Sequence, residues 1–339
     1  MHAIVLVGGF GTRLRPLTDT IPKSMLTVGN EPIITRLVRR LERSGVDTVT
    51  LALGFLPDVF IAAFPDGRCG TVEMRYAVEP EPLDTAGAIR FAANVAGVDD
   101  TFVVVNGDVI TDLDVAALVA RHRDVGAETT LHLIPVEDPS AFGVVELDHA
   151  GRVSRFLEKP APGTTESNLI NAGTYVMEPS VLDEIAADIP VSVERVTFPA
   201  IAARGGLYGV ATEDYWLDVG RPELYLQANL DLLAGRCDAT LPSLVAGGSG
   251  VHPGALVSPD SVVSESVVAS AVPVGAGSRV HRSVLLAGSS VGQDVIVEDS
   301  VVMGIVADGA VLTGAVIGAS AMVESGQQVT NVRIPAPAT

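Results

Sequence analysis

The sequence predicts an α/β domain followed by a parallel β-helix, and two observations support this. In the first two thirds of the chain, short apolar strand segments alternate with amphipathic helical segments, the pattern of a mainly parallel sheet with helices on both faces. Later, similar segments recur at steps of 17, 17 and 15 residues, with aliphatic residues near every sixth position. A hexapeptide period is typical of a parallel β-helix, whose coils bury their aliphatic row only by stacking.

The individual elements follow from the same patterns. Ile4 to Val7 reads as a buried strand, and further strands are expected at residues 48–53, 72–78, 101–106, 129–135 and 141–147. Helices are expected at residues 32–43 and 58–64 and from about Thr85. Alternation across residues 153–157 predicts a hairpin with residues 144–147. The predicted domains are residues 1–236 and 251–332, joined by a linker at 237–250 where Leu, Pro, Ser and Gly become frequent.

Composition limits the classes of function. The chain has 339 residues, is 47% hydrophobic and carries a formal net charge of −19, so nucleic acid and anionic membranes are not expected partners. Cys69 and Cys237 are far apart, which argues against a zinc site or a disulfide framework. No apolar run resembles a signal peptide or a membrane span, and we expect a cytoplasmic protein.

A glycine loop follows the first strand and is suited to phosphate. Gly8, Gly9 and Gly11 allow a sharp turn that brings backbone N–H groups close to an anion. Arg13 adds a planar set of donors that matches phosphate oxygens. A tight turn without a ligand is the alternative for the glycines alone, and Arg13 favours the phosphate site.

Two pairs of residues extend this hypothesis. Asp108 follows a buried strand, and Asp218 lies in an apolar and aromatic run, so together they are candidates for a divalent metal that bridges phosphates; each alone could be a turn or cap residue. The only lysines of the chain are Lys23 and Lys159. Lys159 follows Glu158, and with Asn171 these residues could bind a sugar phosphate, although a surface ion pair is the simpler reading.

The motifs together identify a family resemblance. They are Gly8 to Thr18 with Pro22-Lys23, residues 156–160, residues 171–173, and residues 216–220. The chain resembles the sugar-nucleotide pyrophosphorylases, and specifically the mannose-1-phosphate guanylyltransferases that carry a C-terminal left-handed β-helix. The resemblance implies a Rossmann-like catalytic domain, although the glycine loop matches neither the dinucleotide fingerprint nor the Walker loop.

The resemblance also implies roles for individual residues. Catalysis would depend on Arg13, Lys23, Asp108 and Asp218, with Mg²⁺ between the two aspartates. The sugar 1-phosphate would contact Gly143, Glu158, Lys159 and Asn171. Nucleotide contacts are implied for Leu6, Gly8, Gly9, Gly11, Thr12, Arg13, Lys23, Pro82, Leu83, Gly87 and Asp108. The expected reaction joins a sugar 1-phosphate to a nucleoside triphosphate, with mannose 1-phosphate and GTP favoured.

Several alternatives stay open at this point. Asp84 stands where the family usually has glycine, and it could accept from guanine or cap the helix that begins beside Thr85; Ser24 likewise replaces a usual proline. The substrates could instead be glucose 1-phosphate with UTP or dTTP. A catalytically inactive regulatory homologue, or an added acyltransferase using His281, are further readings. The β-helix is expected to support a homodimer or homotetramer.

Overall fold

The computed structural model describes residues 1–237 and 248–335. By their internal contacts the residues divide into two compact units: residues 1–9 with 34–216, and residues 10–33 with 217–339. Each unit is described separately below. The predicted linker, residues 237–250, lies mostly outside the described residues, and the predicted domain limits stay a prediction.

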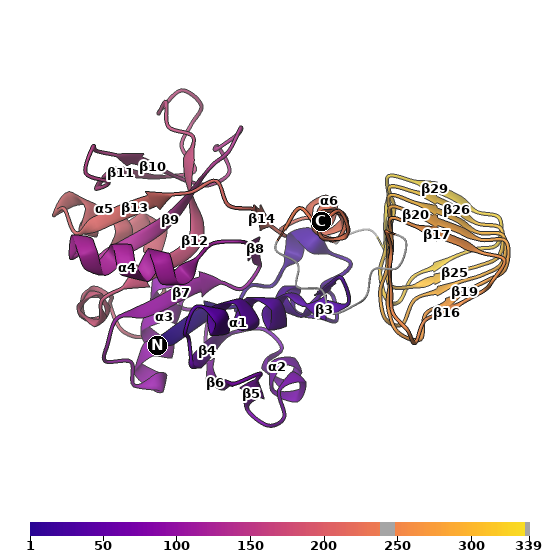
Figure 1. Cartoon of the computed structure of the whole chain (residues 1–339), viewed down its shortest axis with the longest axis horizontal. Coiled ribbons are helices and arrows are strands. Elements are labelled where there is room, and N and C mark those ends of the chain that lie inside the picture. Colours follow the sequence, from indigo (N-terminus) through magenta and orange to yellow (C-terminus); the bar gives the residue numbers. More distant parts are fainter. Residues whose placement is uncertain (238–247, 336–339) are drawn as a thin grey trace. The chain divides into compact units, whose positions relative to one another are not determined.

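The first unit is built on a mixed sheet with the strand order β11-β10-β12-β7-β1-β4-β6-β5 (Figure 1). Its centre is parallel: β1 pairs with both β4 and β7, and β4 pairs with β6. β12 runs antiparallel to β7 and also pairs with β9, which carries β13. The strands of this unit are β1 (His2–Leu6), β4 (Thr48–Leu53), β5 (Arg68–Cys69), β6 (Val72–Val78), β7 (Phe102–Asn106), β8 (Val109–Thr111), β9 (Thr129–Pro135), β10 (Gly143–Leu147), β11 (Val153–Glu158), β12 (Leu169–Met177) and β13 (Leu207–Ala211). The last residue of the unit, Trp216, begins β14 (Trp216–Asp218), whose other two residues belong to the second unit.

Helices cover this sheet with their apolar sides. α3 packs on β1, β4 and β6, and its small side chains, such as Ala92 and Ala93, are fully or almost fully buried there. α4 has Asp114 as its N-cap, whose carboxylate accepts a hydrogen bond from the Ala117 amide, and it ends at Gly126 in the left-handed conformation. The helices are α1 (Ile33–Arg43), α2 (Pro57–Ala63), α3 (Asp84–Ala96), α4 (Val115–Val125), α5 (Phe198–Ala203) and, in the second unit, α6 (Pro222–Leu233).

The second unit contains three parallel sheets whose strands alternate along the chain, so that each turn of chain adds one strand to each sheet (Figure 1). Aliphatic residues from successive coils, such as Val268, Leu285, Val302 and Ile317, fill the interior. This is the predicted β-helix, and its parallel pairing excludes an antiparallel meander. The sheets are β15, β18, β21, β24, β27 and β30 (250–251, 267–268, 284–285, 301–302, 316–317, 333–334); β16, β19, β22, β25 and β28 (256–257, 273–274, 290–291, 305–306, 322–323); and β17, β20, β23, β26 and β29 (262–264, 279–281, 296–298, 311–313, 328–330).

The observed elements confirm most sequence expectations in both units. The strands at 48–53, 72–78 and 129–135 have the predicted limits, and β10 forms the expected antiparallel hairpin with β11. The short helix expected at 58–64 begins one residue earlier, at Pro57. Among the described residues, no helix is long and apolar enough to span a membrane.

Candidate active site

The first glycines of the loop differ in how closely they are packed. β1 ends at Leu6, and a Cβ on Gly8 would lie 3.4 Å from the Gly54 amide nitrogen and 3.5 Å from Oε1 of Glu79. A Cβ on Gly9 would have no neighbour within 4 Å, and Gly9 is exposed. The fold therefore does not need a glycine at position 9, whereas a ligand that approaches the backbone closely would need one.

Glu79 lies beside this loop and received no role from the sequence. It follows β6 directly, and its Oε2 accepts a hydrogen bond of 3.0 Å from the Leu83 amide. Burial raises the pKa of the Glu79 carboxyl, which the Leu83 amide partly offsets. Its half-buried carboxylate fixes the segment that carries Pro82 and Leu83 against the end of the sheet.

Gly87 lies where no side chain fits. A Cβ there would be 2.8 Å from the Leu83 Cβ and 3.0 Å from the Ile189 carbonyl oxygen. The amides of Ala86 and Gly87 donate to the carbonyl of Val191, at 2.8 and 3.2 Å. The start of α3 therefore packs closely against residues 189–191, and this packing alone requires a glycine at position 87.

Asp84 does not cap α3 in the expected way. Its carboxylate accepts a local hydrogen bond of 2.7 Å from the amide of Thr85, and its backbone is in the left-handed region with a φ of 57°. The amides that a capping carboxylate would serve are bound by Val191 instead. The Asp84 side chain is exposed. The start of α3 is capped by the distant carbonyl of Val191 and not, as the capping hypothesis had it, by the Asp84 carboxylate.

Asp108 occupies the short turn between β7 and β8. β12 approaches this strand end closely, because a Cβ on Gly173 would lie 2.6 Å from Nδ2 of Asn106. Gly173 has a φ of 79°, and the register of β12 against β9 shifts between Asn171 and Tyr175. The irregularity in β12 therefore lies next to the strand end that carries Asp108.

Gly143 and Glu158 face each other across the β10–β11 hairpin. They are register partners, and a Cβ on Gly143 would lie 2.6 Å from Cζ of Phe156 and 3.0 Å from Oε2 of Glu158. Burial raises the pKa of Glu158, the negative charge of Glu194 adds to the increase, and Lys159 opposes it. Nζ of Lys159 lies 3.7 Å from Oε1 of Glu158, with the lysine side chain 60% exposed and the glutamate side chain 18% exposed. Most of the Lys159 side chain is therefore open to solvent, beside the mostly buried Glu158.

A polar network joins Asn171 to the same region. Nδ2 of Asn171 donates to the hydroxyl of Tyr175 at 3.1 Å, and its Oδ1 accepts from the Gly173 amide at 3.2 Å. Burial raises the pKa of the fully buried Tyr175, with further contributions from the charges of Glu194, Asp108 and Glu158. Of the predicted site residues, Asn171 therefore contacts this buried tyrosine directly.

Glu194 is the residue of this region that the sequence did not reveal. Its Oε2 accepts hydrogen bonds from Thr85 Oγ1 at 2.8 Å and from Ser192 Oγ at 2.9 Å. It lies in a short π-helical turn at Val193–Thr197, where no periodic pattern points to it. Its position depends on long-range contacts with the start of α3, so a motif search had no signal to follow.

In the second unit, Gly11 begins the phosphate-loop turn that carries Arg13. Gly11 has a φ of 60°, and a Cβ there would lie 3.1 Å from Cγ2 of Thr18. The carbonyl of Gly11 accepts from Thr18 Oγ1 at 2.8 Å and from the Leu14 amide at 2.9 Å. A one-turn 3₁₀ helix, Thr12–Leu14, results, and Arg13 is exposed on it. Here the glycine is required by the fold itself.

Three of the four predicted catalytic residues meet in this unit. Nζ of Lys23 lies 3.2 Å from Oδ1 of Asp218, with the side chains 10% and 23% exposed. Between Arg13 and Asp218 lies Gly220, where a Cβ would be 3.1 Å from Nη2 of Arg13 and 3.1 Å from Oδ1 of Asp218. Asp218 thus pairs with one cationic group, Lys23, and a side chain at position 220 would press on both Asp218 and a second cationic group, Arg13.

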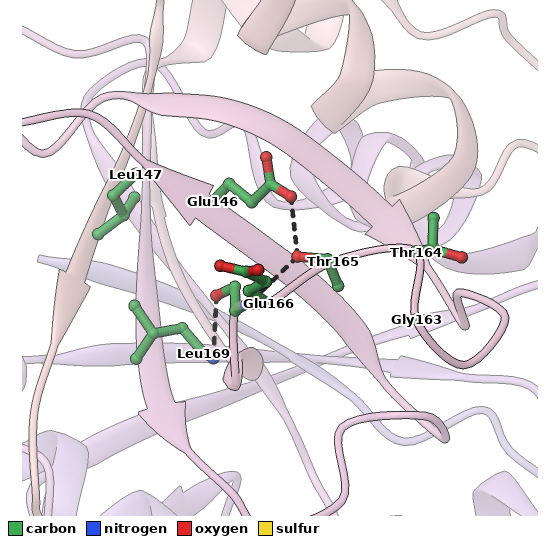
Figure 2. Close-up of a pocket in the computed structure, with 8 residues that line it drawn as sticks. Glu146, Leu147, Gly163, Thr164, Thr165, Glu166 and Leu169 are labelled. Atoms are coloured by element: carbon green, nitrogen blue, oxygen red, sulfur yellow. Dashed lines mark hydrogen bonds between the residues drawn. The ribbon is translucent and has the colours of Figure 1, made fainter.

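A separate hollow of the first unit contains none of the predicted site residues (Figure 2). It is lined by residues 146–147, 163–167 and 169 and has a volume of about 600 Å³. Its polar groups bind one another: Thr165 Oγ1 donates to Glu146 at 2.8 Å, and the Leu169 amide donates to Ser167 Oγ at 3.2 Å. These hydrogen bonds hold the loop that forms the hollow.

Comparison with known proteins shows which family the chain belongs to. The family model of nucleotidyl transferases matches residues 2–235. A mannose-1-phosphate guanylyltransferase of Mycobacterium tuberculosis is 41% identical over 303 residues, which are 88% of this chain and 83% of that protein. A probable mannose-1-phosphate guanylyltransferase 1 of Oryza sativa is 37% identical over 89% of this chain and 86% of its own length.

Other relatives match a shorter stretch. A mannose-1-phosphate guanyltransferase of Aspergillus oryzae is 42% identical over 70% of this chain, and the match spans 64% of that protein. The solved structure of HddC from Yersinia pseudotuberculosis, complexed with GMP-PN, is 29% identical with a TM-score of 0.58, over 67% of this chain and 97% of the other. With the glycine loop, the converging charges and a family match over most of its length, the chain belongs to the nucleotidyl transferase family.

Proposed function

We propose that this chain transfers a guanylyl group from GTP to mannose 1-phosphate and forms GDP-mannose and pyrophosphate. The observation that carries the proposal is that Asp218 pairs with Lys23 and borders Gly220 together with Arg13, in a chain similar to mannose-1-phosphate guanylyltransferases over most of its length. Sugar transfer between nucleotides, acyl transfer and hydrolysis have no comparable support from the described residues.

The reaction is an in-line displacement. A phosphate oxygen of mannose 1-phosphate attacks the α-phosphorus of GTP, the bond from that phosphorus to the bridging oxygen breaks, and pyrophosphate leaves with its electron pair. No side chain becomes covalently attached. The protein contributes by placing two anionic reactants in line and by neutralising charge, which are the main sources of catalysis in phosphoryl-type transfers.

On the nucleotide side, the amides of Gly8, Gly9, Gly11 and Thr12 are proposed to bind the triphosphate, with Leu6, Pro82, Leu83 and Gly87 near the nucleoside. Arg13 and Lys23 would stabilise the charge that grows on the leaving pyrophosphate. The left-handed turn at Gly11 and the exposure of Arg13 support this part of the proposal.

On the sugar side, Glu158 and Asn171 are proposed to bind hydroxyl groups, with Lys159 and the Gly143 backbone near the phosphate. A carboxylate accepts from two hydroxyls, and the amide of Asn171 can donate as well as accept. The register pairing of Gly143 with Glu158, and the exposed Lys159 beside them, support this assignment.

Mg²⁺ is proposed to bind at Asp108 and Asp218. No group of three or more His, Cys, Asp or Glu side chains among the described residues could hold a metal by protein ligands alone. Two carboxylates completed by phosphate oxygens are the donor set that Mg²⁺ usually has in nucleotide enzymes, so these residues fit the ion. When bound, the ion would screen the negative charge of the two phosphate groups.

The decisive experiment is pyrophosphate release measured across GTP, UTP, dTTP, ATP and CTP with mannose 1-phosphate and glucose 1-phosphate. We expect GTP with mannose 1-phosphate to have the highest kcat/KM. A preference for UTP or dTTP with glucose 1-phosphate would contradict the substrates but keep the reaction. Absence of pyrophosphate release with every pair would favour a regulatory protein. Assembly into a dimer or tetramer stays a prediction, which sedimentation velocity tests.

A further inference from the structure

The last coil of the β-helix holds the backbone on either side of Arg13. Arg333 is the first residue of β30, in the same unit as the phosphate loop. Its Nη1 donates to the carbonyl oxygen of Arg13 at 2.9 Å and to that of Arg15 at 3.4 Å, and its Nη2 lies 3.1 Å from Oε1 of Glu223 at the start of α6. One guanidinium therefore joins the loop to α6.

Arg333 donates to backbone carbonyls that do not accept hydrogen bonds within the turn around Arg13. The local backbone hydrogen bonds of the turn end on the carbonyls of Gly11, Thr12 and Leu14. Arg333 binds the carbonyls of Arg13 and Arg15, which lie between and after them. Hydrogen bonds from a charged donor are about twice as strong as neutral ones, so these contacts add to the local bonds that hold the turn carrying Arg13.

A second contact between the β-helix and this loop involves Gly318 and Pro16. Gly318 follows β27, the strand that pairs with β30, and its amide donates to the Ile334 carbonyl at 2.7 Å. A Cβ on Gly318 would lie only 2.7 Å from the Cβ of Pro16. The loop therefore lies directly against the last coil, in contact that leaves no room for a side chain.

The face of the β-helix used here differs from the other two. On the sheet that ends in β30, the outward residues Val267, Val284 and Val301 are almost completely buried, although they do not belong to the interior cluster. On the other sheets, the outward residues Leu256 and Val262 are 65% and 58% exposed. α6 lies along the buried face, with Leu233 against Gly250 and with Glu223 at Arg333.

We infer that Arg333 is a positioning residue for nucleoside triphosphate binding, acting through the backbone of Arg13. The inference rests on the proposed function, because it assigns the triphosphate to Arg13. It gives the β-helix a part in the reaction besides any role in assembly: its final coil sets the orientation of the phosphate-binding arginine. Arg333 itself does not contact the substrate.

The first test compares Arg333→Ala with Arg279→Ala, a control that removes an exposed arginine from β20 of the same β-helix. We expect Arg333→Ala to lower kcat/KM for GTP about tenfold, the effect of losing a charged hydrogen bond, with KM for mannose 1-phosphate unchanged. Arg333→Lys, which keeps the charge and one donor group, should recover part of the loss. Equal effects on both substrates, or no effect, would overturn the inference.

A double-mutant cycle tests whether the effect passes through Arg13. In an Arg13→Ala background, Arg333→Ala should cause no further loss in kcat/KM for GTP, because the side chain that it positions is gone. If the two substitutions instead lower kcat/KM for GTP by independent factors, Arg333 acts on nucleotide binding by a route that does not involve the Arg13 side chain. Arg333 borders a cavity of about 320 Å³, so water can reach its truncated site.

Amide hydrogen exchange separates this inference from the proposed function. Arg333→Ala should speed exchange at the amides of Leu14 and Arg15, whereas Arg279→Ala should not. If the wild-type chain releases no pyrophosphate with any nucleotide, the proposed function fails while this measurement still decides whether Arg333 fixes the loop. If Arg333→Ala does not fold, Gly318→Ala, which pushes on Pro16, should weaken GTP use selectively; an unchanged KM for GTP would overturn the inference.

Discussion

Gly9→Ala should separate the demands of the ligand from those of the fold. A methyl group at this position meets nothing within 4 Å, and Gly9 is not among the residues with positive φ. The protein should therefore fold normally. If the triphosphate binds against this stretch of backbone, the methyl group fills space that the phosphates need, and GTP binding should weaken.

The two effects differ in sign and size. Replacing glycine by alanine at a conformationally compatible site stabilises a protein by roughly 0.4–1 kcal/mol, because the unfolded chain has less freedom to lose. The melting temperature should therefore stay the same or rise slightly. Loss of one close approach to a phosphate is expected to raise KM for GTP at least about tenfold, which corresponds to about 1.4 kcal/mol.

Gly11→Ala is the matched contrast. At Gly11 the φ is 60° and the added Cβ lies 3.1 Å from Cγ2 of Thr18, so the change should cost about 1–2 kcal/mol of stability from the left-handed backbone alone. Thermal unfolding and steady-state kinetics on both variants test the reasoning. A Gly9→Ala protein with unchanged KM for GTP would refute the assignment of this backbone to the triphosphate, and one with a strongly lowered melting temperature would refute the packing argument.

Three further predictions concern the charged groups of both units. The negative charge of Glu194 helps to raise the pKa of Glu158, and we expect KM for mannose 1-phosphate to rise at acidic pH as Glu158 becomes protonated. Glu194→Gln should lower the pKa of Glu158, so this rise in KM should occur at a lower pH than in the wild type. A rise that occurs at a higher pH would contradict the assigned cause. Lys23→Met should lower the free energy of unfolding, measured in urea, by about 2 kcal/mol, because the partly buried Asp218 carboxylate loses the Lys23 ammonium. Adding Asp218→Asn should restore part of that stability. If the effects of the two substitutions simply add, the two side chains are not coupled. Gly143→Ala should raise KM for mannose 1-phosphate more than KM for GTP, because the added Cβ would lie 3.0 Å from Oε2 of Glu158. A larger increase in KM for GTP would mean that Gly143 belongs to the nucleotide site.

Much of the fold could be predicted because the pattern of the chain is local and regular. The buried strands at residues 48–53 and 129–135 are rich in apolar and β-branched residues, and both were placed at their observed limits. The β-helix repeats its aliphatic positions every coil, so one period fixes many strands at once. Helix α6 was not predicted, since it packs against the β-helix and is buried on most sides.

The site was harder to predict where residues act through distant partners. The sequence indicated Glu158 and Asn171 from their surroundings, but Glu194 depends on a hydrogen bond from Thr85, 109 positions away. Asp84 was expected to serve the start of α3, yet the carbonyl of Val191 serves those amides. Both contacts involve the segment of residues 189–194, which contains Glu194 and supplies the Val191 carbonyl, and this segment carries no motif of its own.

The second unit shows why the motif and its support have to be considered together. Gly11 and Arg13 are recognisable from sequence because phosphate chemistry restricts the residue types that can serve. The residues that hold them, Arg333 and Gly318, are about 320 and 300 positions further on. Nothing about phosphate requires an arginine or a glycine at those places; the requirement arises only from how the last coil meets the loop. A relative that lacks the β-helix must therefore hold this turn by other contacts, so transferring the glycine loop alone to another chain should not transfer the orientation of its arginine.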